Sequence, residues 1–247
     1  MSLKDKIYLK NFYVNNSIKF YCKPKKVRDL FVAGVEFVKI ILAKLNLLEW
    51  SFKERVLERP FVFQNLPKNK NAKILDVGCS DSIMPIEIAS LGYETYGNDP
   101  RAYPFKHPNL KFIQADGLNL DFPDNYFDAI TCISVIEHVG LNMDYGSKAE
   151  GRKDKMLMKK MKKMIKKKGK IILTTSLAGK AKILENGHTR IYSKKELDWL
   201  ISDLKKMEER YFYKNGEHFI EINPSSIQNL INDNPNLEIL VMFLLKK

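Results

Sequence analysis

The chain has 247 residues, of which 45% are hydrophobic, and this suffices for one large domain with a full core. Its three cysteines, Cys22, Cys79 and Cys132, are far apart and form no C-x-x-C pair, so neither a disulfide framework nor a structural zinc site is predicted and a reducing cytoplasm is favoured. The net charge of +13 suits an anionic partner, but lysine greatly outnumbers arginine and the arginine–aromatic stripe typical of specific RNA readers is missing.

Residues 1–70 are predicted to form a helical extension that has no secretory signal. A helix is expected over residues 29–48, where Glu36, Lys39 and Lys44 interrupt the apolar run and argue against a membrane-spanning segment. A core or interface helix is the main interpretation, and a helix on a membrane surface is the alternative. A second helix is expected over residues 50–63, broken at Pro60, before a linker at 67–71.

A second part, residues 71–247, has strands that alternate with helices. Strands are predicted at 72–77, 94–98, 110–115, 127–133 and 170–175, and helices at 84–91, 153–168 and 225–231. A further helix is expected to start at Ser193, because Glu196 lies at the capping-box distance. Segments 207–213 and 237–245 complete the chain. This alternation predicts an α/β domain with a mostly parallel sheet between two layers of helices.

Two of the predicted strands end in a carboxylate. The first ends at Asp76 and runs into a turn that contains Gly78, and the second ends at Asp99. Because the carboxyl ends of parallel strands meet at one edge of the sheet, a close-approach turn and an acid there are typical of a nucleoside site. A dinucleotide-binding dehydrogenase would have G-x-G-x-x-G in this turn, and only Gly78 is present, so that class is disfavoured.

The motif Ile-Leu-Asp-Val-Gly-Cys-Ser-Asp-Ser at 74–82, together with Glu-His-Val-Gly at 137–140, resembles the class I S-adenosylmethionine (AdoMet)-dependent methyltransferases. The resemblance spans roughly residues 60–245. It implies a Rossmann-like, seven-stranded, mostly parallel sheet with helices on both faces, and an enzyme that uses AdoMet as its cofactor. Members of this family usually have three glycines in the first motif, and this chain has Ser80 and Ser82 at two of these positions.

The resemblance assigns the strand-end acids to the cofactor. Asp76 is expected to face the ammonium of the methionine moiety, and Asp99 to accept hydrogen bonds from the two ribose hydroxyls, unless it only caps the turn before Pro100. Asp116 is expected to meet the adenine amino group, with a plain turn aspartate as the alternative. The other expected cofactor contacts are Gly78, Cys79, Ser80, Pro100, Gly117 and Ser134.

Glu137 and His138 follow the fourth predicted strand and are the first catalytic candidates. A neutral imidazole has the basicity to take a proton from a hydroxyl acceptor near pH 7, but His138 equally suits a structural place in the first turn after the strand. Glu137 is expected to contact substrate or a metal, and His188 is a second candidate for the base. Since Ser134 stands where metal-dependent relatives have an acid, too few ligands remain for a hard cation and no metal is predicted.

Three further residues are expected to contact the acceptor. Arg190 would pair with a carboxylate or phosphate, beside Tyr192, and Tyr145 lies in an insertion at 140–146 that forms either a lid or a solvated loop. The alternative for the loop around Arg190 is that its own side chains anchor it.

One combination of segments is similar to a branch of these enzymes often found with polysaccharide or glycolipid assembly genes: Glu-Arg-Pro at 58–60, Glu137-His-Val-Gly140 with Tyr145-Gly146, and His188-x-Arg190-Ile-Tyr192. The expected reaction is methyl transfer to a hydroxyl of a sugar or other small molecule. An RNA methyltransferase and a non-catalytic subunit with this fold are the alternatives. No transmembrane segment is expected, and contact with a membrane surface and the oligomeric state stay open.

Overall fold

The computed structural model describes residues 54–80, 82–141, 152–184, 187–216 and 218–247. These residues belong to one compact unit, Phe52–Lys247. The helix predicted over residues 29–48 and the candidate substrate residue Tyr145 lie outside the described residues. The predicted boundary at residue 70 stays a prediction.

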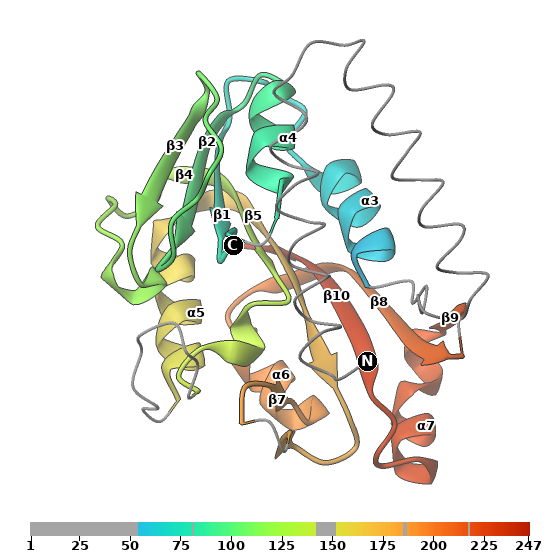
Figure 1. The fold of residues 1–247 in the computed structure, drawn as a ribbon. Helices are drawn as coiled ribbons and strands as arrows, with labels where there is room; N and C mark the ends of the chain where they lie inside the picture. Colours follow the sequence, from blue (N-terminus) through green and yellow to red (C-terminus); the bar gives the residue numbers. More distant parts are fainter. Residues whose placement is uncertain (1–53, 81, 142–151, 185–186, 217) are drawn as a thin grey trace, which may run out of the picture. The chain divides into compact units, whose positions relative to one another are not determined.

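A single twisted sheet organises this unit (Figure 1). Its strands lie in the order β3-β2-β1-β4-β5-β10-β8-β9. Their bounds are β1 (Lys73–Val77), β2 (Glu94–Asp99), β3 (Leu110–Gln114), β4 (Phe127–Ile133), β5 (Ile165–Leu177), β8 (Lys205–Asn215), β9 (His218–Ile222) and β10 (Ile239–Lys246). Strands β1 to β5 are parallel to one another, whereas β10 is antiparallel to β5 and β8, and β9 is antiparallel to β8.

The mostly parallel sheet was predicted, but the predicted number of seven strands is wrong, because the described residues form eight in this sheet. The extra strand is β9, which makes a hairpin with β8 after Gly216, a glycine with a φ of +58°. Only Ile222 at the end of β9 is buried. A short edge strand with so little buried apolar surface has a weak sequence signal.

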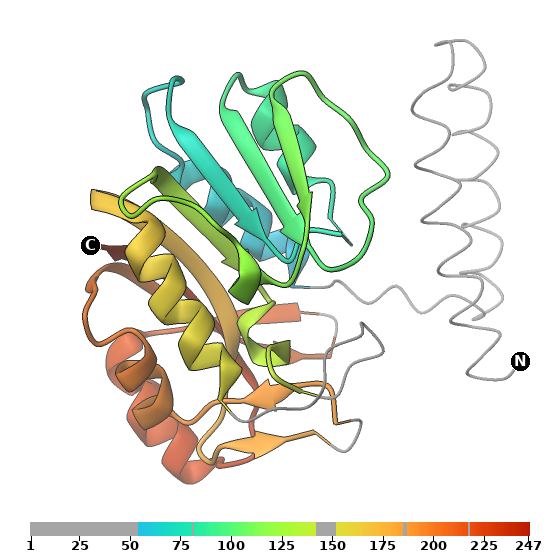
Figure 2. The ribbon, with the colours of Figure 1, turned by 90° about the vertical axis from the view of Figure 1, so that its left-hand side faces the viewer.

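Helices cover both faces of the sheet, as predicted. Five are described: α3 (Arg55–Asn65), α4 (Met84–Ser90), α5 (Lys153–Met164), α6 (Lys194–Leu200) and α7 (Ile227–Asp233). Buried side chains of α5, α6 and α7 pack with one face, where Leu75 and Val77 of β1 point (Figure 2). Helices α3 and α4 lie on the other face (Figure 1), and their buried side chains pack there with Ile74 of β1. Successive side chains of β1 point to opposite faces of the sheet, so this strand contributes to the hydrophobic layers on both sides.

Some helix limits differ from the sequence prediction. Helix α5 ends at Met164 rather than residue 168, because Ile165 is fully buried and pairs with Phe127 of β4. Helix α3 continues through Pro60 instead of breaking there, since the buried side chains of Phe61 and Val62 hold the following turn on the sheet. The predicted capping box of α6 is confirmed, with Ser193 and Glu196 bonded reciprocally.

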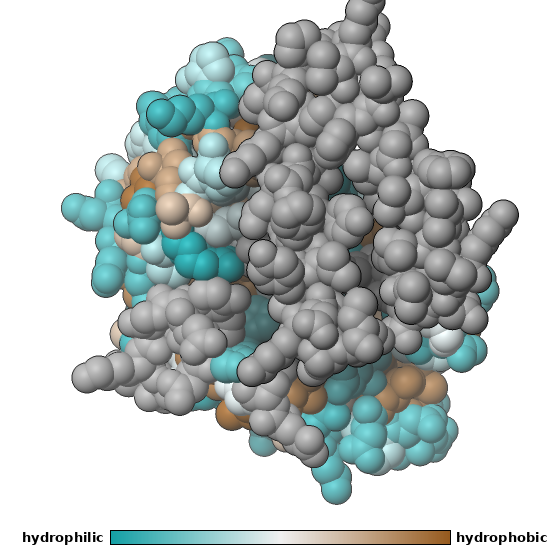
Figure 3. Space-filling model, viewed as in Figure 1, coloured by the Kyte–Doolittle hydropathy of each residue, from teal (hydrophilic) through white to brown (hydrophobic). Residues whose placement is uncertain are grey.

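Shorter elements connect the strands and helices of this unit. Three 3₁₀ turns are described, η1 (Gly117–Asn119), η2 (Ile136–His138) and η3 (Pro224–Ser226), and β6 (Lys182–Ile183) pairs with β7 (Arg190–Ile191) in a small second sheet. On the face drawn in Figure 3, hydrophilic residues dominate the described surface and hydrophobic ones form separate small areas. Within the described ranges, no helix combines the length and apolarity needed to cross a bilayer.

Candidate functional site

The turn after β1 brings its backbone against the end of β2. The N–H groups of Gly78 and Cys79 both donate to the carbonyl of Asn98, at 2.7 and 3.1 Å. Gly78 has a φ of +73°, and a Cβ atom there would collide with the side chain of Val135. Glycine is therefore required at this position for both conformation and space. The close approach places the tips of β1, β2 and β4 together.

Asp99, at the tip of β2, is saturated with hydrogen bonds. Its Oδ1 accepts from the backbone N–H of Arg101 and from Nε of the same residue, both at 2.9 Å. Its Oδ2 accepts from the backbone N–H of Ser80 at 3.0 Å and from Nη2 of Arg101 at 3.1 Å. The whole residue is 2% exposed. Burial raises the pKa of Asp99, but these hydrogen bonds and the charge of Arg101 more than offset it and hold the pKa below its ordinary value.

Asp76, at the tip of β1, is the second buried acid of this edge. Its Oδ1 accepts a hydrogen bond of 2.6 Å from Oγ1 of Thr131 on β4. Burial raises the pKa of Asp76 from 3.8 to about 7, and the Thr131 hydrogen bond and the charge of Arg55 only partly oppose that rise. A carboxyl group with this pKa is charged mainly when a cation accompanies it, so the site suits a positively charged ligand group.

The other predicted cofactor residues lie around these two acids with local roles of their own. Asp116 caps η1 by accepting from the N–H of Leu118 at 2.9 Å, and Gly117 lies closely against Leu157. Cys79 is buried, and burial raises the pKa of its thiol. Pro100 is exposed, and its carbonyl accepts from Gln114.

The end of β4 is held by a residue from helix α3. Oε1 of Glu58 accepts hydrogen bonds of 2.5 Å from both Oγ of Ser134 and Oγ1 of Thr174. Its Oε2 accepts from Nη1 of Arg55 at 2.6 Å. Ser134 has a φ of +50°, an uncommon conformation for a residue with a side chain, and Glu58 helps to fix it. The hydroxyl of Ser134, predicted as a cofactor contact, is thus directed at Glu58.

The turn η2 carries the two catalytic candidates in different surroundings. Glu137 is 3% exposed and accepts from Oγ1 of Thr175 at 2.9 Å, and burial raises its pKa to about 8. His138 is half-buried, and its Nδ1 lies 2.5 Å from the carbonyl oxygen of His188. Burial lowers the pKa of His138, with a further contribution from the charge of Arg55. The two predicted histidines therefore meet, but through the backbone of His188.

Arg190 and Tyr192, predicted to contact the acceptor, are buried beneath η2. Tyr192 is 0% exposed, and its hydroxyl lies 3.1 Å from the carbonyl of Ile136 and 3.0 Å from Oδ2 of Asp154. Arg190 is 6% exposed and pairs with the same carboxylate at 3.4 Å. Arg152 adds a second ion pair to Asp154 at 2.9 Å. This network joins α5 and β7 to the turn that carries His138.

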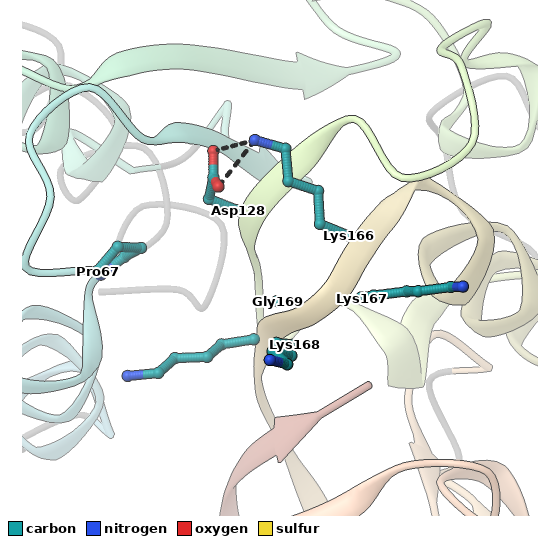
Figure 4. Close-up of a pocket in the computed structure, with 7 residues that line it drawn as sticks. Pro67, Asp128, Lys166, Lys167, Lys168 and Gly169 are labelled. Atoms are coloured by element: carbon teal, nitrogen blue, oxygen red, sulfur yellow. Dashed lines mark hydrogen bonds and ion pairs between the residues drawn. The ribbon is translucent and has the colours of Figure 1, made fainter.

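A pocket of about 250 Å³ lies at the other edge of the sheet, where β4 and β5 begin. Its lining residues are Pro67, Asp128, Lys166, Lys167, Lys168, Gly169 and Lys170. Figure 4 shows Lys166 directed at Asp128, whose carboxylate it contacts at 2.8 and 2.9 Å, while Lys167 extends away from it. Since parallel strands have their amino ends here, this pocket is separate from the strand tips that carry Asp76 and Asp99.

Four residues near the edge that carries Asp76 and Asp99 were not recognised from the sequence as site residues: Arg55, Glu58, Arg101 and Asp154. Glu58 was noted only as part of a branch-specific motif, and Arg101 follows directly on the Asn-Asp-Pro segment that was noted. Glu58 and Asp154 have partners 116 and 38 residues away along the chain, so no local spacing marks these two acids. Among the described residues, no group of three or more metal-ligating side chains is arranged to hold a cation.

The acceptor groups at the edge that carries Asp76 and Asp99 fit AdoMet in their chemistry. Asp76 is a buried acid that needs a cation to ionise fully, as an ammonium or a sulfonium would provide. Asp99, on the neighbouring strand, has two carboxylate oxygens, the number that a vicinal diol requires, although Arg101 binds one position on each of them in this structure. Gly78 keeps the intervening turn close to the sheet.

Comparison with known proteins agrees with this fold. Residues 50–234 match the family described as "Methyltransferase domain". An AdoMet-dependent methyltransferase from Archaeoglobus fulgidus is similar with a TM-score of 0.55 and 14% identity, over 79% of this chain and 95% of that one. The 1,6-didemethyltoxoflavin N1-methyltransferase of Burkholderia thailandensis, solved with bound 1,6-didemethyltoxoflavin and S-adenosylhomocysteine, is similar with a TM-score of 0.52 and 12% identity, over 78% of this chain and 76% of that one.

The [4+2]-cyclase SpnF is also similar, with a TM-score of 0.54 and 13% identity, over 76% of this chain and 78% of that one. The structural likenesses show the fold, whereas the family match spans most of the chain. The chain therefore belongs to the methyltransferase-domain family, as its motifs predicted.

Proposed function

We propose that this enzyme methylates a hydroxyl group of a sugar or another small molecule, with Nε2 of His138 as the base. The observation that carries the proposal is the 2.5 Å contact between Nδ1 of His138 and the carbonyl oxygen of His188. It lies at the end of β4, on the same edge of the sheet as Asp76 and Asp99.

The partner of Nδ1 decides which nitrogen of His138 can act. A carbonyl oxygen only accepts hydrogen bonds, so Nδ1 must carry the hydrogen. Burial lowers the pKa of His138 from its ordinary value, which favours the neutral ring. A neutral imidazole with hydrogen on Nδ1 has its lone pair on Nε2, and this lone pair can take the proton of an acceptor hydroxyl.

The cofactor would be held by the two strand-tip acids. In this proposal Asp76 pairs with the ammonium of the methionine moiety, Asp99 accepts from the ribose hydroxyls, and Asp116 contacts the adenine amino group. When bound, AdoMet supplies a methyl group that is already activated for transfer. The chain's residues then have to orient the acceptor, take up its proton and exclude water, and most of the acceleration is expected from this positioning.

Two observations favour a sugar or another small molecule over RNA as the acceptor. The combination of Glu58, His138 and Arg190 favours a sugar through its resemblance to the polysaccharide-linked branch. Lysines that would attract RNA line the pocket at the other edge of the sheet, where they would not bring an acceptor to His138. The cyclase SpnF has the same fold with another reaction in its name, so methyl transfer must be measured directly.

A labelled-methyl transfer screen against fractionated cell extract, read by mass spectrometry, tests the proposal. On the acceptor it finds, we expect His138→Ala to lower turnover by about 10²-fold or more and to leave AdoMet affinity unchanged. His188→Ala is the matched control, because it keeps the backbone carbonyl that orients His138, and most turnover should remain. Full turnover in His138→Ala, or labelling confined to nuclease-sensitive material, would refute the proposal.

A further inference from the structure

Arg101 covers the acid that is proposed to hold the ribose. The side chain of Arg101 is 31% exposed and that of Asp99 is 3% exposed. Of the four hydrogen bonds to this carboxylate, two come from backbone N–H groups, of Ser80 and Arg101 itself, and two from the Arg101 guanidinium. The guanidinium gives one to each carboxylate oxygen, in the two-point manner typical of an arginine–carboxylate pair.

The two guanidinium bonds use the acceptor capacity that a diol needs. An ionised carboxylate has about four acceptor positions, two on each oxygen. The backbone N–H groups take one position on each oxygen and Nε and Nη2 of Arg101 take the others. A ribose diol donates one hydrogen bond from each hydroxyl, so it requires the same two positions. Diol and guanidinium cannot both bind Asp99 fully.

Ser80 fixes the segment from which Arg101 reaches back. Its Oγ donates to the carbonyl of Arg101 at 3.3 Å, and its N–H donates to Asp99 at 3.0 Å. Ser80 stands where the resembling family usually has glycine, which offers no hydroxyl. The serine thus ties the backbone of Arg101 to the turn after β1, and the guanidinium can return to Asp99 from this anchored position.

From this geometry we infer that Arg101 competes with AdoMet for Asp99, and that Ser80 strengthens this competition by anchoring the Arg101 backbone. The inference rests on the proposed ribose role of Asp99. Binding of AdoMet then requires the guanidinium to leave the carboxylate, and its partial exposure gives it a route to solvent. The enzyme holds AdoMet and S-adenosylhomocysteine less tightly than the bare carboxylate would, which favours product release.

Calorimetry with S-adenosylhomocysteine tests the competition. We expect Arg101→Ala to lower its Kd roughly fivefold or more, because the ligand no longer has to break the ion pair. Ser80→Gly should act in the same direction and should add little in the Arg101→Ala background. A 2′,3′-dideoxy analogue lacks the diol, so its Kd should not change with Arg101→Ala. Arg210→Ala is the matched control, since Arg210 forms a similar two-point pair with Glu221 at 2.7 and 3.0 Å on β8 and β9.

Asp99→Asn separates failure of the inference from failure of the cofactor assignment. If Asp99→Asn abolishes binding while Arg101→Ala leaves the Kd unchanged or raises it, the competition is refuted and the ribose role stands. If Asp99→Asn binds like the wild type, the ribose role fails and the competition fails with it. A melting curve for each variant checks that the variant is folded, so that a loss of affinity is not caused by unfolding.

Discussion

Ser134 donates a hydrogen bond of 2.5 Å to Glu58, although 76 residues separate them in the chain. This contact joins helix α3, which precedes β1, to the strained turn at the end of β4. Because Glu58 also binds Thr174 of β5 and Arg55, a single buried carboxylate fixes the tips of two strands. Helix α3 is therefore part of the framework that supports His138.

Removal of the Glu58 carboxylate is predicted to destabilise the fold. Glu58 is 0% exposed, and its loss leaves two buried hydroxyls without their acceptor. We expect Glu58→Ala to lower the free energy of unfolding by about 3 kcal/mol, measured by urea denaturation. Glu54→Ala, at an exposed position on the same helix with no side-chain capping bond, should change it by less than about 0.5 kcal/mol. Equal effects of both variants would contradict the role of Glu58.

AdoMet affinity is predicted to depend on the ionisation of Asp76. In the free enzyme the pKa of Asp76 is raised to about 7 by burial. If its carboxylate faces the AdoMet ammonium, the ligand binds the ionised form, so binding releases a proton below pH 7. Affinity should therefore fall as the pH drops below about 7, by up to about tenfold per pH unit, and stay constant above it. Calorimetry in buffers with different ionisation enthalpies measures the released proton.

Asp76→Asn is the matched test of this pH dependence. The variant keeps an oxygen that can accept from Thr131, so the turn is preserved, but it has no titrating group at this position. Its affinity should be weaker and should no longer change between pH 6 and 8. The raised pKa also means that the native state binds a proton which the unfolded chain has lost between pH 4 and 7. The contribution of Asp76 to the free energy of unfolding therefore falls as the pH rises through that window. In Asp76→Asn this contribution is absent, so the free energy of unfolding should decline less between pH 4 and 7 than in the wild type.

The elements that could be predicted from the sequence are those whose cause is local. Strands β1 and β2 with their terminal acids, the Gly78 turn and the capping box at Ser193 each follow from neighbouring residues. The eighth strand was missed because β9 buries little and owes its place to pairing with β8. Local hydrophobic periodicity indicates which side chains of an element face the core, but it does not indicate which strand pairs with an edge strand.

The site was less predictable, because the orientation of its side chains depends on groups that are distant in the sequence. The hydrogen on Nδ1 of His138 is assigned through a carbonyl 50 residues further along the chain. Arg190 and Tyr192 lie in a short polar segment that resembles an exposed loop, yet the buried carboxylate of Asp154 draws both of them inward. A spacing rule identifies residue types suited to chemistry, and only the packing shows which of their atoms are already bonded.

The hydroxyl of Tyr192 is predicted to act as a support for η2. It is fully buried and bonds with the carbonyl of Ile136, two residues before His138, and with Asp154. We expect Tyr192→Phe to lower the free energy of unfolding by about 1–2 kcal/mol, since a buried acceptor loses its donor. It should reduce kcat more than it raises the KM of the acceptor, because His138 loses its fixed position while cofactor binding remains.

Steady-state kinetics and denaturation together distinguish this support from the acceptor contact expected from the sequence. If Tyr192 touches the acceptor, Tyr192→Phe should raise the acceptor KM and leave unfolding unchanged, which would contradict a supporting role. Tyr213→Phe, on β8, is the control for loss of a tyrosine hydroxyl elsewhere in the sheet. Asp154→Asn should resemble Tyr192→Phe in kcat and exceed it in lost stability, because the ion pairs with Arg152 and Arg190 are weakened as well.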